Sequence, residues 1–179
     1  MSDWSLHFKM AKRGKNYSYS CLQINVPNDL ANKILEYGES IPKKDLGEDG
    51  VENECHITIK YGFHTDSTSK FEEILKDVKP FIVKIGEMSI FAADENRDSD
   101  VVKLDIHSLA LHKLNGLISK IKNTSTYKDY VPHCTIAYVK KDLGKKYTKK
   151  NMFKDEEFEV TEVVFSASSG KKTKIKLGG

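Results

Sequence analysis

The sequence has few of the features that mark secreted, membrane-spanning or metal-clustered proteins. It contains three cysteines and no CxxC pair, which argues against a disulfide framework and against a cysteine zinc site. No apolar run approaches the ~18 residues that a membrane helix needs, and the first residues lack the apolar stretch of a secretory signal. We therefore expect a cytoplasmic protein of a reducing compartment, with no membrane partner.

Arginine is also scarce, so lysine carries nearly all of the positive charge. The 29 lysines and arginines include only Arg13 and Arg97, and the net charge is +3 because 26 acidic residues oppose them. So balanced a chain is not expected to hold a stable nucleic-acid partner. Six lysines between residues 140 and 150 predict either a solubilising surface or an electropositive rim that attracts phosphates.

Short apolar patterns along the whole chain predict a mixture of strands and helices. Period-two alternation predicts strands over residues 17–26, 54–61, 81–91, 102–106, 131–139, 159–166 and 173–177. Helical spacing predicts helices that begin near Asn28, near Ser67 or Ser69, and after Ser108, while residues 39–53 read as a polar loop. We expect an α+β fold with an antiparallel or mixed sheet. One domain should span residues 1–179, with residues 1–15, including Trp4, as an N-terminal extension.

One short pattern occurs twice. His56-Ile57-Thr58-Ile59 in the first half is matched by His133-Cys134-Thr135-Ile136, 77 residues later. In a strand, residues i and i+2 point to one face about 6.5–7 Å apart. Each histidine should therefore project with its threonine, while Cys55 and Cys134 face the core. Two such strands across a groove would gather two imidazoles and two hydroxyls around one point.

That arrangement suits phosphodiester chemistry. A neutral imidazole can take a proton from a nucleophile, an imidazolium can give one to the leaving oxygen, and hydroxyls can bind the phosphoryl oxygens. No metal is required, because imidazole titrates near neutral pH. A metal site from His56, His64 and His133 has no convincing ligand spacing. No G-x-S-x-G pattern is present to indicate a serine nucleophile.

Paired H-x-T motifs, one in each half, resemble the 2H phosphoesterase (LigT-like) superfamily. The strings that carry the resemblance are HITIKYGFH at residues 56–64, PHCTIAYV at 132–139, TEVVFS at 161–166 and GKKTKI at 170–175. The last two strings are most similar to a phage branch that includes the anti-CBASS phosphodiesterases, which destroy cyclic-oligonucleotide alarm signals of bacterial immunity. The resemblance spans roughly residues 17–177.

This resemblance implies a bilobal fold in which two pseudo-symmetric antiparallel or mixed sheets flank a central cleft, with helices outside. It implies cleavage of a 3′-5′ linkage in cyclic di- or trinucleotides without a cofactor, in the host cytosol of a phage. His56 and His133 would form the acid–base pair, with Thr58 and Thr135 binding phosphate. Which histidine is the base stays open, and the nucleophile is either the substrate's ribose 2′-hydroxyl or water.

Four further residues are expected to contact the substrate. Tyr17 and Tyr19 share the groove-side face, where they could touch a phosphate or stack on a base. Lys60 follows Thr58 on the same face and is a plausible phosphate contact, and the resemblance implies that Glu162 holds the base or orients a histidine. The same alternation places Tyr61 and Tyr138 on the buried face, so neither is assigned to the site.

Two other functions remain open. An RNA-end enzyme of the same superfamily would act on 2′,3′-cyclic phosphates or 2′-5′ bonds, as a 2′-5′ RNA ligase-like protein. A non-catalytic nucleotide-binding sponge would use the lysines alone, but sequestration has no need of duplicated histidines. Base preference, ring size, product end and oligomeric state are not predicted by the sequence.

Overall fold

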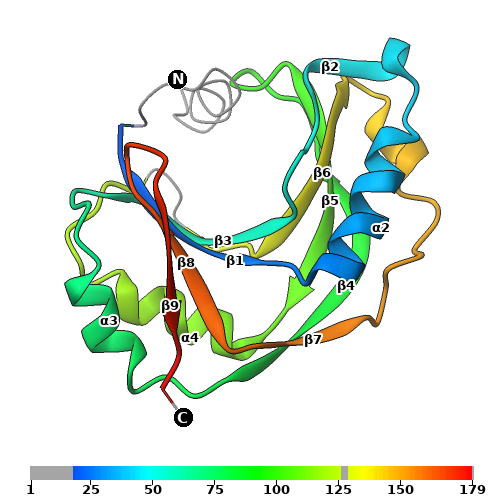
Figure 1. The fold of residues 1–179 in the computed structure, drawn as a ribbon. Helices are drawn as coiled ribbons and strands as arrows, with labels where there is room; N and C mark the ends of the chain where they lie inside the picture. Colours follow the sequence, from blue (N-terminus) through cyan, green and yellow to red (C-terminus); the bar gives the residue numbers. More distant parts are fainter. Residues whose placement is uncertain (1–17, 126–128, 179) are drawn as a thin grey trace.

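The strands form one antiparallel sheet that curls around, as Figure 1 shows. The computed structural model describes residues 18–125 and 129–178, so the expected N-terminal extension with Trp4, and Tyr17, lie outside the described residues. The strand order is β7-β4-β5-β6-β3-β1-β8-β9, and β2 pairs with β6 beside this path. The strands are β1 (Ser20–Asn25), β2 (Leu46–Val51), β3 (His56–Phe63), β4 (Phe81–Phe91), β5 (Ser99–His107), β6 (His133–Lys140), β7 (Glu157–Val160), β8 (Glu162–Ser166) and β9 (Lys172–Lys176).

The sheet has two halves, each built around one of the repeated motifs. We call β3, β1, β8 and β9 the first lobe, and β7, β4, β5, β6 and β2 the second lobe. The halves meet where β3 pairs with β6, through the residues Ile57 and Cys134. The prediction of an α+β, bilobal fold with antiparallel strands is confirmed, and the two expected sheets are joined by this short pairing into one.

In the described part of the chain, three helices cover one face of the sheet. They are α2 (Asn28–Glu39), α3 (Ser69–Leu75) and α4 (Leu109–Ile118). Helix α2 packs on β6 and β2, α4 packs on β3, and α3 packs on α4 and β9. The hydrophobic core lies on this helix-covered face and includes Ile57, Ile59, Cys134 and Ile136. We call the opposite face of the sheet the inner face. Within the described ranges, no helix has both the length and the apolar composition needed to cross a bilayer.

Local sequence explains where the helices begin. The Ser108 side chain accepts a hydrogen bond from the Leu111 backbone N–H, so it caps α4 as predicted. Helix α2 begins directly after Pro27 and carries Asp29 in its first turn, where a negative charge is favourable. The cap of α3 is Thr68, between the two serines that were expected, and its side chain makes no capping bond.

Two strands differ from the sequence prediction. Strand β2 lies inside the expected loop 39–53, where only its terminal residues Leu46 and Val51 pack against the core. The single strand expected over residues 159–166 is divided at Thr161 into β7 and β8. Strand β7 pairs with β4 of the second lobe, and β8 pairs with β1 and β9 of the first. This segment therefore passes from one lobe to the other, which alternation within one strand could not reveal.

The lysine-rich segment 140–150 lies beside the helix-covered face. It contains a 3-10 helix, η2 (Gly144–Tyr147), which packs against β5 and β4. The Tyr37 hydroxyl of α2 donates a hydrogen bond to the Tyr147 carbonyl at 2.5 Å, and Lys146 Nζ bonds to Asp45 at 2.9 Å. Both interpretations of this segment, a solubilising surface and an electropositive rim that attracts phosphates, stay predictions.

Candidate active site

The two H-x-T motifs lie in neighbouring antiparallel strands. Because Ile57 of β3 is paired with Cys134 of β6, the positions flanking that pair set His56 beside Thr135 and Thr58 beside His133. The Ile57 and Cys134 side chains are fully buried in the core, so the motif residues on either side project to the inner face. Cys55 is also buried, as predicted. The structure thus brings both histidines and both threonines together from opposite halves of the chain.

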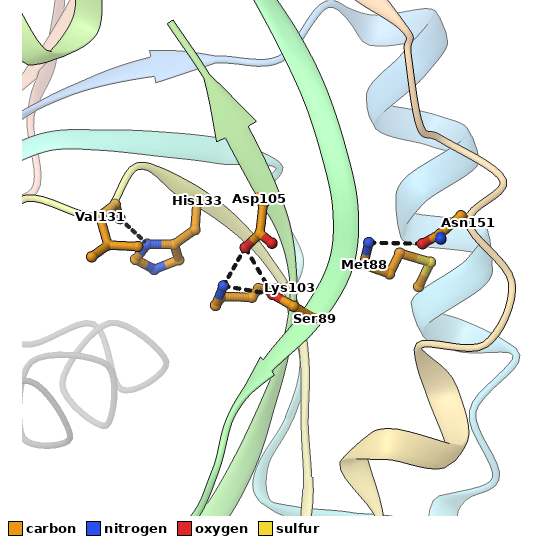
Figure 2. Close-up of polar contacts among 7 residues, drawn as sticks. All are labelled: Met88, Ser89, Lys103, Asp105, Val131, His133 and Asn151. Carbon is orange, nitrogen blue, oxygen red and sulfur yellow. Dashed lines mark hydrogen bonds and ion pairs between the residues drawn. The ribbon is translucent and has the colours of Figure 1, made fainter.

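The two histidines are held in the same way. His56 Nδ1 lies 3.2 Å from the Glu54 carbonyl oxygen, and His133 Nδ1 lies 2.7 Å from the Val131 carbonyl oxygen. Figure 2 shows the second of these contacts. A carbonyl oxygen can only accept, so each Nδ1 carries a proton. In the neutral ring the lone pair is then on Nε2, which suits this nitrogen for taking up a proton.

Each histidine also lies near an ion pair between an acid and a lysine. Near His56 the pair is Glu54 with Lys172. Glu54 lies two residues before the histidine, and Lys172 lies in β9. Near His133 the pair is Asp105 with Lys103, on the neighbouring strand β5. The β5–β6 register places Asp105 opposite His133 and Lys103 opposite Thr135. The site therefore has a repeated electrostatic pattern as well as a repeated motif.

Burial lowers the pKa of both histidines, but the neighbouring charges act unequally. For His56, burial lowers the pKa, while the Glu54 charge and the bond to the Glu54 carbonyl oppose this change. The Lys172 charge also lowers the pKa of His56, and its effect is the smallest of the four. For His133, burial lowers the pKa to about 4. The bond to Val131 opposes this effect, and Lys103 and His56 add to it. The influence of His56 on the pKa of His133 also indicates that the two rings are close.

A β-bulge follows each H-x-T motif and changes which residues face inward. The pairing of β3 with β1 slips by one residue between Thr58 and Lys60, so that Tyr61 lies opposite Cys21. The pairing of β6 with β5 slips in the same way after Thr135, so that Tyr138 lies opposite Val101. These slips return both tyrosines to the face of their threonines. The prediction that Tyr61 and Tyr138 belong to the buried face of the strands is therefore wrong.

The surroundings of Tyr138 are consistent with this placement. Its ring is almost fully buried, yet its pKa is affected by Glu52, Asp49, Thr135 and Arg97. Burial raises the pKa of its phenol far above the ordinary value, so the hydroxyl stays protonated. The signal in the sequence was the longer repeat H-x-T-I-x-Y, in which a tyrosine follows each threonine by three residues.

Tyr19 and Lys60 have different surroundings from those expected. The Tyr19 ring stacks on His64 with centroids 5.1 Å apart and meets the edge of Tyr61 at 5.8 Å. The bulge sets Lys60 opposite Leu22, which is a core residue, so the register no longer assigns Lys60 to the face of Thr58. Burial lowers the pKa of the Lys60 ammonium. A substrate contact by Tyr19 stays a prediction, and that of Lys60 loses its geometric argument.

Glu162 lies in β8, which is separated from β3 by β1. Its carboxylate is bound by Lys174 Nζ at 2.6 Å. The acid close to His56 is instead Glu54, which lies two residues before the histidine in the chain. The expected contact of Glu162 with substrate stays a prediction, and that of Tyr17 falls outside the described residues.

No group of three or more His, Cys, Asp or Glu side chains in the described part of the chain is arranged to hold a metal ion. The three cysteines are all buried thiols with no disulfide between them. Burial raises the pKa of Cys21 to about 12, so its thiol stays protonated. Among the described residues, the repeated motif places two imidazoles, those of His56 and His133, on the inner face.

The sequence matches a known protein family. The model of the 2′-5′ RNA ligase superfamily matches residues 49–172, which include both H-x-T motifs and more than half of the chain. The chain belongs to this superfamily of LigT-like 2H phosphoesterases, which includes phosphodiesterases and RNA ligases. A search of curated protein sequences found no significant match.

Solved structures share the fold at low sequence identity. Usb1 of Kluyveromyces marxianus is 11% identical with a TM-score of 0.57, over 92% of this chain and 100% of that one. The protein TT0787 of Thermus thermophilus is 12% identical with a TM-score of 0.60, over 90% and 98%. Apo LigT of E. coli is 15% identical with a TM-score of 0.51, over 89% and 94%. These similarities extend over nearly the whole length of each protein and show a shared fold.

Proposed function

We propose that this chain is a metal-independent phosphodiesterase that hydrolyses 3′-5′ linkages of cyclic oligonucleotide second messengers. The observation that carries the proposal is the meeting of the two H-x-T motifs through the Ile57–Cys134 pair. A structural histidine in a strand needs no counterpart, whereas proton transfer at a phosphodiester needs one donor and one acceptor. Two histidines held alike on neighbouring strands meet that need.

The reaction follows from the groups at the site. One histidine, in its neutral form with the lone pair on Nε2, takes the proton from the attacking hydroxyl, which is the ribose 2′-hydroxyl or water. The attacking oxygen then bonds to phosphorus and the bond from phosphorus to the leaving oxygen breaks. The second histidine, which starts protonated, donates its proton to the leaving oxygen. Thr58 and Thr135 donate hydrogen bonds to the phosphoryl oxygens, on which negative charge increases in the transition state.

The choice of a nucleotide substrate is supported by the relatives and by the flanking strings. LigT of E. coli has been crystallised with 3′-AMP, and Usb1 of K. marxianus with uridine monophosphate. The strings TEVVFS at 161–166 and GKKTKI at 170–175 resemble those of the phage anti-CBASS branch. In the infected cell, such an activity would remove the cyclic messenger and let a phage evade CBASS immunity.

A second candidate function is an RNA-end phosphodiesterase or ligase. The description of the matching family, the 2′-5′ RNA ligase superfamily, favours it, since the match over residues 49–172 includes both H-x-T motifs. The chemistry at the histidines would be unchanged, and only the groups that hold the bases and riboses would differ. The choice between the two functions is therefore a question of substrate and is tested by direct competition.

The deciding experiment offers the protein a panel of substrates in buffer with EDTA. The panel contains cyclic di- and trinucleotides, an RNA with a 2′,3′-cyclic phosphate end and a 2′-5′-linked dinucleotide, and the products are read by mass spectrometry. We expect cleavage of a cyclic oligonucleotide at a 3′-5′ linkage. Faster turnover of the RNA end would support the second candidate, and tight binding with the ligand recovered intact would support a sponge.

The rate is expected to peak in mildly acidic solution. Catalysis needs one neutral and one protonated histidine, and the pKa of His133 is about 4 while that of His56 is lowered from 6.5. As the pH increases, kcat/KM should rise through about pH 4, where His133 loses its proton, and should fall again before pH 6.5 is reached, where His56 loses its proton. These two limbs report on the free enzyme, because kcat/KM does. A maximum above pH 7 would contradict the prediction that His56 and His133 are the two groups whose protonation limits the rate.

A further inference from the structure

A buried lysine that the sequence pattern does not predict lies beside one histidine of the pair. The Lys103 side chain is only 5% exposed, although a charged lysine is rarely buried unless it is paired. Its ammonium donates hydrogen bonds to the Asp105 carboxylate and, at 2.7 Å, to the Ser89 hydroxyl. Ser89 in turn donates to Asp105 at 2.7 Å. Figure 2 shows this three-residue cluster beside His133.

An aromatic ring connects the lysine with the histidine. Lys103 Nζ lies 4.3 Å from the centre of the Phe91 ring. The His133 ring packs against Phe91 in an edge-to-face arrangement, with the two ring centroids 4.9 Å apart. A cation over an aromatic face is stabilised by the ring quadrupole. The ammonium is therefore held by a carboxylate, a hydroxyl and a ring, close to the imidazole and away from bulk water.

The two sides of the site differ in the balance of charge and exposure. On the first lobe, Lys172 is 42% exposed, and the Glu54 charge acts on His56 more strongly than Lys172 does. On the second lobe, Lys103 is buried while Asp105 is 33% exposed, and the lysine acts on His133 more strongly than the acid. A buried charge is less screened by water than an exposed one. The repeated pattern of acid and lysine is thus inverted between the lobes.

We propose that Lys103, held by Asp105 and Ser89 against Phe91, is a positioning residue that keeps His133 unprotonated and makes it the proton acceptor of the pair. The inference deepens the proposed function and rests on it. His133 Nε2 takes the proton of the attacking hydroxyl, and His56 donates its Nε2 proton to the leaving oxygen. Solvent then returns one proton to His56 and removes one from His133, so that the cycle closes.

The test measures the protonation of His133 directly in the full-length protein. The midpoint of each histidine is followed by NMR of its ring carbon–proton signal against pH, with His133 assigned from the variant His133→Asn. Lys103→Met should raise the His133 midpoint by about one pH unit, because a cation is lost and Asp105 is left uncompensated. Asp105→Asn should lower it, because the lysine is then unopposed.

Opposite shifts from two adjacent substitutions distinguish an electrostatic role from a structural one. Lys103→Arg keeps the charge and should leave the His133 midpoint near that of the unsubstituted protein. Lys172→Met is the matched control on the other lobe and should raise the midpoint of His56 while leaving that of His133 unchanged. Circular dichroism shows whether each variant is folded, and if Lys103→Met is not, the direction of the Asp105→Asn shift decides alone.

The proposal is overturned if Lys103→Met leaves the His133 midpoint in place, or if Asp105→Asn moves it upward or not at all. These midpoints are measured without substrate. A protein that cleaves none of the phosphodiesters in the panel would therefore disprove the proposed function while the midpoints still decide the electrostatic role of Lys103. With an active protein, the acidic limb of kcat/KM should shift in the same direction as the midpoint in each variant.

Discussion

Replacing His56 or His133 with alanine is expected to lower kcat by about 10²–10⁴ in buffer containing EDTA. In the proposed reaction each histidine carries out one of two proton transfers, and β3 and β6 contain no other histidine. The rate is measured in a single turnover with excess protein, so that product release does not hide the chemical step. The double variant should be about as slow as the slower single variant, because the two groups act as a unit.

A matched control separates catalysis from folding. His107 is an exposed histidine at the end of β5, and His107→Ala should keep the full rate. His56→Asn and His133→Asn retain a polar side chain of similar size and should be as slow as the alanine variants while remaining folded. Undiminished turnover by both alanine variants would show that the paired histidines are not the acid and base.

The four central residues could be placed from the sequence because strand alternation and repetition are local signals. His56 and Thr58 share a face of β3, and His133 and Thr135 share a face of β6, as period two requires. Their meeting followed from the duplication, since a repeated motif in two halves is useful only if the halves face each other. This part of the prediction depended on no long-range contact.

What alternation could not supply was the effect of an extra residue in a strand. A bulge shifts every later residue to the other face, and nothing in the residues Ile59 or Ile136 marks one. Tyr61 and Tyr138 were therefore placed on the wrong face, and Lys60 was given a face that the register does not support. The two motifs match over six positions, each ending in a tyrosine, and this repeat does not depend on strict alternation along the strand.

The charged neighbours of the histidines could not be found from one sequence for a different reason. Lys103 and Asp105 lie on β5, well before His133 in the chain, and only the order of strands in the sheet makes them its neighbours. Lys172 lies in β9, near the C-terminal end of the described chain, and pairs with Glu54. Sheet order depends on the whole fold, whereas the face of a residue depends on its own strand. The motif residues were therefore predictable and their electrostatic surroundings were not.

Removing the hydroxyl of Thr58 or Thr135 is expected to lower kcat by about 10²-fold, since in the proposed reaction each hydroxyl donates to an oxygen that gains charge in the transition state. Valine has nearly the shape of threonine, so Thr58→Val and Thr135→Val test the hydroxyl with little change in packing. Serine keeps the hydroxyl and removes only a methyl group, so Thr58→Ser and Thr135→Ser should remain within a few-fold of the unsubstituted protein.

The measurement is single-turnover kcat together with KM. Because the hydroxyls act in the transition state, the loss should fall on kcat, whereas a loss confined to KM would show that they hold the substrate without stabilising the reacting phosphate. Equal rates for the valine and serine variants would contradict the role assigned to both threonines.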